Sequence, residues 1–121
     1  MNYKKNHLLV LPIIFFRGPM VAQQAQFKTV CEDQECVITA YNTDNIYAGY
    51  IKLDRCNINY VNVFDEFRKK GFAQALLQQA RSQAAAHGCK EVTLFSLKKL
   101  INYYQRNGFI CNDNQKCTHP I

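Results

Sequence analysis

The most regular pattern in the chain lies in residues 72–87, where apolar residues recur every three or four positions. Such spacing places them on one side of an α-helix. The residues of this apolar stripe are Phe72, Leu76, Leu77, Ala80 and Ala84. Alanine, leucine, glutamine and arginine, which favour helices, dominate the segment, and Gly88 follows as a typical helix stop. The pattern predicts an amphipathic helix over residues 72–87.

Before this helix, several short segments are rich in the β-branched and aromatic residues that favour strands. They are residues 27–31, 36–41, 46–53 and 57–64. Only Glu-Asp-Gln-Glu separates the first two, and residues 42–45 give a second polar turn signal. We therefore expect a run of strands before the helix, of which the first two form a tight hairpin.

After the helix, residues 91–96 contain the sequence Val-Thr-Leu-Phe, which is typical of a buried strand. Residues 97–106 predict a second amphipathic helix that ends at Asn107 and Gly108, and residues 109–121 predict one or two final strands. A strand, a helix and a further strand in succession predict a parallel pair with a right-handed crossover. The predicted fold class is therefore α+β, with a mixed sheet.

The 121 residues allow one small domain, which we place at residues 27–121, after an N-terminal extension of residues 1–26. In the extension, Lys4 and Lys5 precede the apolar residues 8–16. This order resembles a secretory signal, and the apolar run is too short to span a bilayer as a helix. The alternatives are a buried first strand or an extension without function.

The net charge is +6 and the isoelectric point is about 9.1, which favours anionic partners without choosing among them. Half of this charge comes from Lys4, Lys5 and Arg17 in the N-terminal extension. The remaining net charge is too small for a surface that binds polyanions, so we do not expect nucleic-acid binding.

The chain has 6 cysteines, which is many for a protein of a reducing compartment. Cys31 and Cys36 bracket one turn, and Cys111 and Cys117 bracket another, so each pair could cross-link a hairpin. Cys56 and Cys89 flank strands and are predicted to be core thiols. The alternative is that all of these cysteines are reduced in the cytosol. No Cys-x-x-Cys occurs and the histidines are scattered, so we expect no metal site.

The most informative stretch for chemistry is Phe-Arg-Lys-Lys-Gly-Phe-Ala, residues 67–73, between a predicted strand and the long helix. The start of a helix presents unpaired N–H groups and positive potential, which suit a pyrophosphate. Because Gly71 has no side chain, the backbone can approach the phosphates closely. The small side chain of Ala73 leaves room for them beside the first turn of the helix. Arg68, Lys69 and Lys70 add positive charge. The alternative to an anion site is a basic helix start that is only solvated. A nucleotide P-loop is excluded, because the sequence Gly-Lys-Ser/Thr that ends this motif is absent.

Arg-x-x-Gly-x-Ala before a long helix resembles the coenzyme A loop of the GCN5-related N-acetyltransferase (GNAT) superfamily. The loop, helix and strand over residues 71–96 follow that family's order. The sequence Tyr-Tyr-Gln-Arg-Asn-Gly-Phe at residues 103–109 is similar to its second signature. Tyr-Ala-Gly-Tyr-Ile at residues 47–51 resembles the strand before its central strand. The resemblance covers residues 36–109.

This resemblance implies a twisted, mostly antiparallel mixed sheet in which the helix joins the parallel pair. It implies that amides of Lys69, Lys70, Gly71, Phe72 and Ala73 hold the pyrophosphate of acetyl-CoA, beside Arg68. It also implies that the backbone at Val61 and Val63 lies along the pantetheine arm, and that Tyr104 protonates the departing thiolate. The implied activity is acetyl transfer, in a ternary complex, to a small-molecule amine, a protein lysine or a protein N-terminus.

The sequence departs from the family pattern in several respects. Residues 56–64 contain no carboxylate to act as general base, and we assign Asp65 and Glu66 to a solvated turn. Only a turn fits between Cys31 and Cys36, where the family inserts two helices. The acceptor groove is then open, or a second subunit of a homodimer completes it. Leu97 replaces the usual asparagine or serine, although Ser96 is adjacent.

Because acetyl-CoA is a cytosolic metabolite, we expect a cytoplasmic enzyme without a membrane span. The alternative is an exported, disulfide-bonded binding module on the same fold, without catalytic activity. The signal-like start and the paired cysteines favour this alternative.

Overall fold

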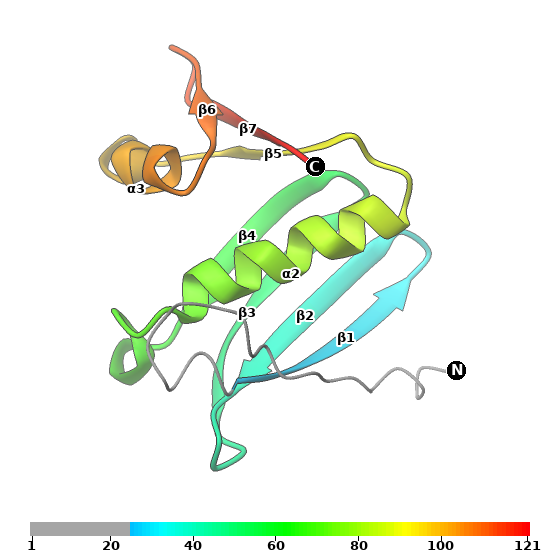
Figure 1. Ribbon diagram of the computed structural model, residues 1–121, viewed down its shortest axis with the longest axis vertical. Helices are drawn as coiled ribbons and strands as arrows, with labels where there is room; N and C mark the ends of the chain where they lie inside the picture. Colours follow the sequence, from blue (N-terminus) through cyan, green and yellow to red (C-terminus); the bar gives the residue numbers. More distant parts are fainter. Residues whose placement is uncertain (1–24) are drawn as a thin grey trace.

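The computed structural model describes residues 25–121. Within them, one seven-stranded sheet has the order β1-β2-β3-β4-β5-β7-β6 (Figure 1). The apolar run 8–16, predicted as a signal or a first strand, lies outside the described residues. No helix in the described part of the chain has the length and apolar character that crossing a bilayer requires.

The first half of the sheet is an antiparallel meander, as the strand pattern predicts. Its strands are β1 (Gln26–Glu32), β2 (Glu35–Tyr41), β3 (Tyr47–Asp54) and β4 (Asn57–Val63). The β1–β2 connection is a tight hairpin in which Cys31 lies directly opposite Cys36. The expected absence of inserted helices between these two strands is confirmed.

The long helix α2 (Phe72–Ala86) lies across one face of β2, β3 and β4 (Figure 1). The predicted apolar stripe is its buried side: Phe72, Leu76, Leu77, Ala80 and Ala84 are each at most 1% exposed. The stripe packs on alternate residues of the sheet, because successive side chains of a strand point to opposite faces. Ile38 and Ile51, opposite each other on β2 and β3, are both fully buried there.

The strands β4 and β5 (Glu91–Phe95) are parallel, as predicted, but they are paired only between Asn57 and Thr93. At that end, the N–H of Thr93 donates to the carbonyl of Cys56 at 3.0 Å. The hydroxyl of Thr93 also donates to Oδ1 of Asn57 at 2.7 Å. Beyond this point the two strands diverge, and the sheet is open between the end of β4 and β5.

The C-terminal part continues the sheet on the far side of this opening. The predicted second helix is a short 3₁₀ turn (Lys98–Leu100) followed by α3 (Ile101–Arg106). The predicted final strands are β6 (Ile110–Cys111) and β7 (Lys116–Pro120), with β7 between β5 and β6. The α3 helix therefore faces the start of α2 across the gap between β4 and β5.

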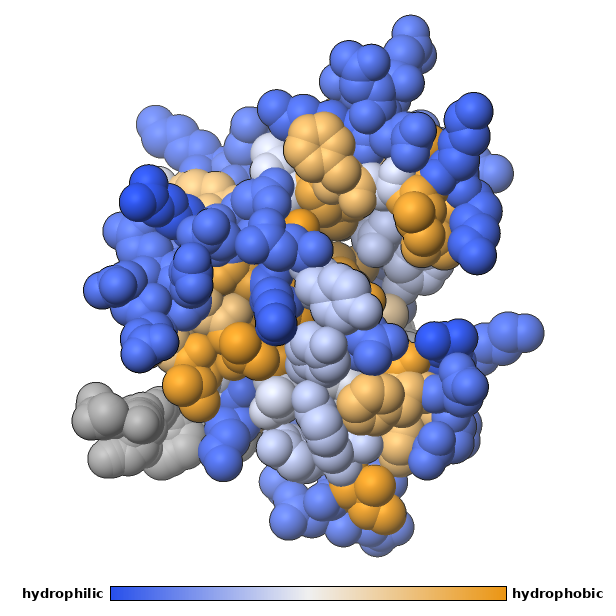
Figure 2. All heavy atoms as spheres, turned by 180° about the vertical axis from the view of Figure 1, so that it is seen from behind, coloured by the Kyte–Doolittle hydropathy of each residue, from blue (hydrophilic) through white to orange (hydrophobic). Residues whose placement is uncertain are grey.

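The other face of the meander has no helix over it within residues 25–121. Tyrosines form a row across this face: the ring centroids of Tyr41 and Tyr47 are 5.7 Å apart, as are those of Tyr50 and Tyr60. Tyr47 and Tyr50 join the two pairs at 6.4 Å. Figure 2 shows this side as a central band of intermediate hydropathy between patches of hydrophobic side chains.

All six cysteines are paired in disulfides, Cys31–Cys36, Cys56–Cys89 and Cys111–Cys117. The two local pairs agree with the sequence prediction. The prediction that Cys56 and Cys89 are free core thiols is wrong. Cys56 lies in the β3–β4 turn and Cys89 lies just before β5, and the single contact between β4 and β5 brings these two positions to a Cα–Cα distance of 5.8 Å.

Candidate active site

At the end of β4, backbone N–H groups face the gap between β4 and β5. Gly49 and Val63 lie opposite each other, and the N–H of Phe64 donates to the carbonyl of Ala48 at 3.0 Å. This bond joins the residues that flank the pair, so Gly49 and Val63 exchange no hydrogen bonds themselves. The N–H of Val63 therefore points away from β3, and the same alternation applies to Val61. Because β5 has already diverged at this level, both groups face the gap.

The loop between β4 and α2 gathers further N–H groups at the same place. Lys69 (φ 63°) and Gly71 (φ 88°) are both in the left-handed conformation, and such residues in a loop form concave N–H surfaces that bind anions. Gly71 is the N-cap of α2, and its carbonyl accepts from the N–H of Ala75 at 3.0 Å. The N–H groups of residues 72–74 have no partner inside the helix. This cradle, at the positive end of the helix dipole, fits a pyrophosphate.

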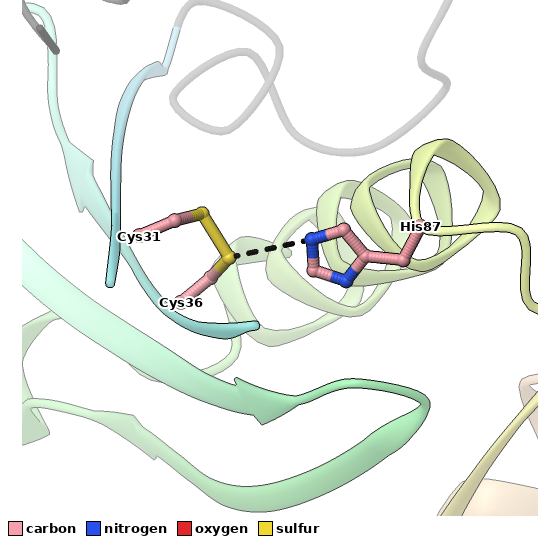
Figure 3. Close-up of side chains that lie close together, drawn as sticks. All are labelled: Cys31, Cys36 and His87. Carbon is pink, nitrogen blue, oxygen red and sulfur yellow. Dashed lines mark hydrogen bonds between the residues drawn. A yellow bond between two sulfur atoms is a disulfide. The ribbon is translucent and has the colours of Figure 1, made fainter. Parts of the chain in front are cut away.

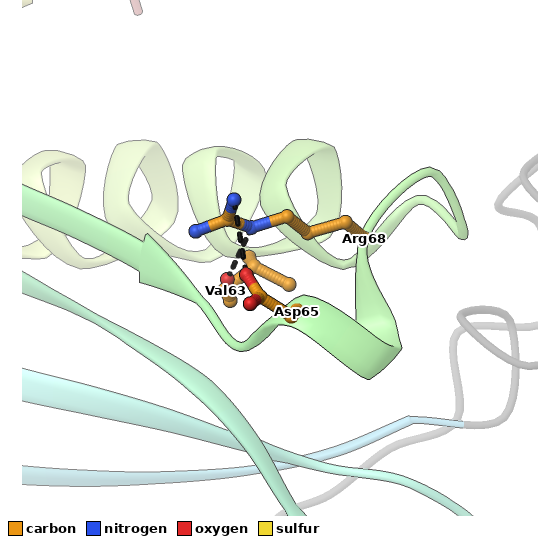
Figure 4. Close-up of polar contacts among 3 residues, drawn as sticks. All are labelled: Val63, Asp65 and Arg68. Carbon is orange, nitrogen blue, oxygen red and sulfur yellow. Dashed lines mark hydrogen bonds and ion pairs between the residues drawn. The ribbon is translucent and has the colours of Figure 1, made fainter.

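Arg68 folds its side chain back onto the end of β4 (Figure 4). Its Nε donates to the carbonyl of Val63 at 2.9 Å, and Nη1 lies 3.1 Å from Oδ1 of Asp65. Asp65 belongs to a 3₁₀ turn (Asp65–Phe67) and its side chain is exposed, so its ion pair with Arg68 contributes little to stability. The guanidinium thus holds the strand end and the loop together, and it keeps a positive charge beside the cradle.

A cleft of about 670 Å³ opens between β4, this loop, the start of α2 and the α3 region. The structure brings nearly all of the predicted site residues to its wall. Those that line it are Val61, Val63, Arg68, Lys69, Gly71, Phe72, Ala73 and Tyr104. Lys70 is exposed and is the one predicted site residue outside the lining.

The far wall contains residues that the sequence analysis did not single out. Lys99, Tyr103 and Asn107 line the cleft from the α3 side. The amide of Asn107 donates to the carbonyl of Tyr103 at 2.9 Å, which closes the end of the helix. Lys99 adds a second source of positive charge across from the loop. Neighbouring Lys98 and Lys99 are visible in the sequence, but only the folded chain shows that Lys99 faces the loop.

Tyr104 lies at the bottom of this wall and is 8% exposed. Its ring packs edge-on against Phe109 and Tyr103, with centroid distances of 5.6 Å and 5.3 Å. Burial raises the pKa of the Tyr104 phenol above its ordinary value of about 10. Burial and the nearby Tyr104 likewise raise the pKa of Tyr103. Both phenols therefore keep their protons at neutral pH.

Two further sequence expectations concern polar groups near the cleft. Ser96 is 5% exposed, and its hydroxyl donates to the carbonyl of Leu97 at 2.7 Å, so it does not replace the missing polar contact at Leu97. Asp65 and Glu66 lie in an exposed turn, as the pattern predicts. No carboxylate among residues 25–121 lines the cleft.

A sheet that opens between two parallel strands, with an anion-binding loop and a buried tyrosine at the opening, agrees with the resemblance in the sequence. The chain matches the acetyltransferase (GNAT) domain family over residues 15–121. It therefore belongs to the GNAT family of acetyltransferases. No curated protein matches it at a significant level.

Solved structures share this fold at low sequence identity. A GCN5-related N-acetyltransferase from Rhodopseudomonas palustris has a TM-score of 0.67 and 13% identity, over 72% of this chain and 62% of its own. A Bacillus anthracis protein assigned as a streptothricin acetyltransferase, in complex with acetyl coenzyme A, has a TM-score of 0.65 and 15% identity, over 76% and 65%.

The PaiA N-acetyltransferase of Thermoplasma acidophilum, in complex with coenzyme A, has a TM-score of 0.60 and 19% identity, over 70% and 60%. At these identities the likeness shows the fold alone. The chain spans less than two thirds of the length of these three proteins.

Proposed function

We propose that this chain transfers the acetyl group of acetyl-CoA to a primary amine, by direct attack of the amine on the thioester. The observation that carries the proposal is that one cleft combines an anion cradle, an unpaired strand edge and a buried, protonated tyrosine. Each matches one part of acetyl-CoA: the pyrophosphate, the pantetheine arm and the sulfur that leaves.

The cradle supports binding of the pyrophosphate. The left-handed residues Lys69 and Gly71 and the free N–H groups of residues 72–74 offer several donors to one anion. Arg68 and Lys99 flank the cleft and add positive charge on its two sides. In this proposal Lys70, which does not line the cleft, contributes through its backbone.

The edge of β4 supports binding of the arm and stabilisation of the transition state. The N–H groups of Val61 and Val63 face the gap, where an extended amide-containing arm can pair with them as a further strand would. An N–H fixed beside the thioester carbonyl stabilises the negative charge that develops on its oxygen during attack. Because the sheet holds these dipoles in place, they need no reorganisation during the reaction.

Tyr104 supports the departure of the thiolate. Its raised pKa keeps the phenol protonated, and its position in the cleft wall makes it the donor to the leaving sulfur. No carboxylate of the described residues lines the cleft, so the proposal includes no side-chain base. The amine then attacks in its neutral form after losing a proton to water.

Within residues 25–121, a hairpin turn and no helix joins β1 and β2, so the acceptor groove of this proposal is open on the face of the meander that carries the tyrosine row. An open groove suits a lysine or N-terminus of a polypeptide. A small amine would require a further wall, which a second copy of the chain in a homodimer could supply.

The test is titration with acetyl-CoA by calorimetry. We expect binding by the unmodified chain and its loss in Gly71→Glu, because a carboxylate in the cradle repels the pyrophosphate. Ser82→Glu is the control: it adds the same charge on the exposed side of α2, outside the cleft, and should leave binding unchanged. Absence of binding to the unmodified chain at millimolar ligand would reject the proposed function.

The disulfides favour a second candidate, an exported binding module on this fold. All six cysteines are paired, a state typical of oxidising compartments, where acetyl-CoA is scarce. Counting free thiols in protein from its native host separates the candidates. Four or more blocked cysteines would support the exported module, and mostly free thiols would support the cytoplasmic enzyme.

A further inference from the structure

The Cys31–Cys36 disulfide lies away from the acetyl-CoA cleft, at the tip of the β1–β2 hairpin. Its two ends differ in exposure: Cys31 is exposed, whereas Cys36 is 1% exposed. Both cysteines line a second cleft of about 610 Å³ on this end of the sheet. Val37 and Lys52 of that cleft point away from α2, whereas the two sulfurs contact α2, so the cleft itself gives no access to them. Because Cys31 is the exposed residue of the pair, a small molecule meets its sulfur more readily than that of Cys36.

An imidazole lies against the buried sulfur (Figure 3). Nε2 of His87, at the C-terminal end of α2, is 3.8 Å from Sγ of Cys36. The amide nitrogen of Gln83, one turn earlier, lies 3.3 Å from the same ring nitrogen and donates to Sγ of Cys31 at 3.7 Å. The other ring nitrogen, Nδ1, is buried and has no hydrogen-bond partner among residues 25–121. The amide nitrogen of Gln83 can donate but cannot accept, so the sulfur of Cys36 is the one of these two neighbours that can accept a proton from Nε2.

The second hairpin disulfide provides an internal comparison. Cys111 and Cys117 also lie directly opposite each other, with the same Cα–Cα distance of 4.0 Å as Cys31 and Cys36, and one of them is fully buried. The buried sulfur, Sγ of Cys117, lies 4.0 Å from the backbone carbonyl of Gln115. Its neighbour is thus a carbonyl group, whereas the neighbour of the Cys36 sulfur is an imidazole. The two disulfides are alike in backbone geometry and differ in the side chains that surround the sulfurs.

We propose that Cys31–Cys36 is a reactive disulfide that undergoes exchange with small thiols, with His87 as the proton donor to its leaving group. The thiolate of the incoming thiol attacks Sγ of Cys31. A new bond forms between these sulfurs, the Sγ–Sγ bond to Cys36 breaks, and its electron pair stays on Cys36 as a thiolate. His87, with a proton on Nε2, donates to this thiolate. A second thiol then displaces Cys31, which yields a small-molecule disulfide and two protein thiols.

The direction of attack follows from the two environments. Exchange needs access to the attacked sulfur, which favours the exposed Cys31, and a stabilised thiolate on the departing sulfur, which favours Cys36 beside the imidazole. Attack on Cys36 would require a thiol to enter the core beneath α2. The proposal does not depend on the acetyl-transfer function.

The test is mapping of exchange with 2-mercaptoethanol as the probe. The oxidised full-length chain is treated for short times, quenched with acid and N-ethylmaleimide, and analysed by peptide mass spectrometry. We expect the first mixed disulfide at Cys31 with N-ethylmaleimide on Cys36, while Cys111–Cys117 and Cys56–Cys89 remain closed. Equal or faster opening of either other disulfide, or a first adduct on Cys36, would overturn the proposal.

A variant isolates the contribution of the imidazole. His87→Asn should slow adduct formation at Cys31 about tenfold, as expected when a hydrogen bond to a charged group is lost. His119→Asn, which replaces a histidine near the other hairpin disulfide, should leave the rate at Cys31 unchanged. An unchanged rate in His87→Asn would refute the role of His87. If this variant does not fold, the order of opening among the disulfides of the unmodified chain still decides the proposal.

Discussion

Tyr104 illustrates how one residue can serve both the core and the chemistry. Its ring packs against Phe109 and Tyr103, while the residue also lines the cleft between β4, the start of α2 and α3. A phenylalanine preserves the ring and removes only the hydroxyl. The packing role and the proposed acid role can therefore be separated by one substitution.

We predict that Tyr104→Phe lowers kcat about 10²- to 10⁴-fold, the usual contribution of a positioned acid, and leaves acetyl-CoA affinity unchanged. Steady-state kinetics and calorimetric titration measure the two quantities. Tyr103→Phe is the matched control, because it removes the neighbouring cleft hydroxyl. Equal turnover in Tyr104→Phe and the unmodified chain would remove Tyr104 from the mechanism.

The pH dependence of turnover follows from the same residue. Because burial raises the pKa of Tyr104, the phenol keeps its proton up to pH values above about 10. Because no carboxylate of residues 25–121 lines the cleft, the rate at saturating acetyl-CoA should rise with pH as the acceptor amine loses its proton. It should fall only in the range where Tyr104 ionises.

The measurement is a pH–rate profile with an acceptor amine of known pKa. The profile of Tyr104→Phe should lack the alkaline fall. A rise whose midpoint does not change when acceptors of different pKa are compared would contradict this prediction, since it would reveal a base in the protein.

At the scale of elements, the relation between β4 and β5 decides the site. The strands are held together at one end by the Asn57–Thr93 pair, the hydrogen bonds of Thr93 and the Cys56–Cys89 disulfide. At the other end they diverge, and the N–H groups of Val61 and Val63 face the gap between them. The cleft therefore depends on a firm junction at the end where the strands meet.

We predict that removing the Cys56–Cys89 disulfide destabilises the chain more than removing Cys111–Cys117. The first closes a chain separation of 33 residues and the second a separation of 6. Loop-closure entropy then gives losses of about 4 and about 2 kcal/mol, respectively. Urea denaturation of the two double serine variants measures the free energies of unfolding. A larger loss for the Cys111–Cys117 variant would contradict the prediction.

At the scale of the whole molecule, the fold is a GNAT domain in which a hairpin joins the first two described strands. One face of the meander is covered by α2, and within residues 25–121 the opposite face exposes a row of tyrosines beside the open sheet (Figures 1 and 2). The cleft proposed to bind acetyl-CoA is thus built from local loop and strand geometry. In the proposed function, the acceptor groove depends on what covers the face of the meander that carries the tyrosine row.

Much of this architecture could be predicted from the sequence because its signals are local. The stripe from Phe72 to Ala84 determines the helix, and Gly71 determines the turn before it, since a left-handed residue is needed there. Cys31 and Cys36 bracket a short turn, which indicates their pairing. The resemblance could select Tyr104 and the loop residues because their motifs are short and continuous, and the structure places nearly all of them in the wall of one cleft.

The tertiary structure decided what depends on residues far apart in the chain. The pairing of Cys56 with Cys89 and the position of Lys99 across from the loop follow from the single contact between β4 and β5, which no local pattern encodes. The same holds for the contact between His87 and Cys36, residues from a helix end and a hairpin tip. Local periodicity determines elements and turns, whereas packing alone determines which side chains of distant elements meet.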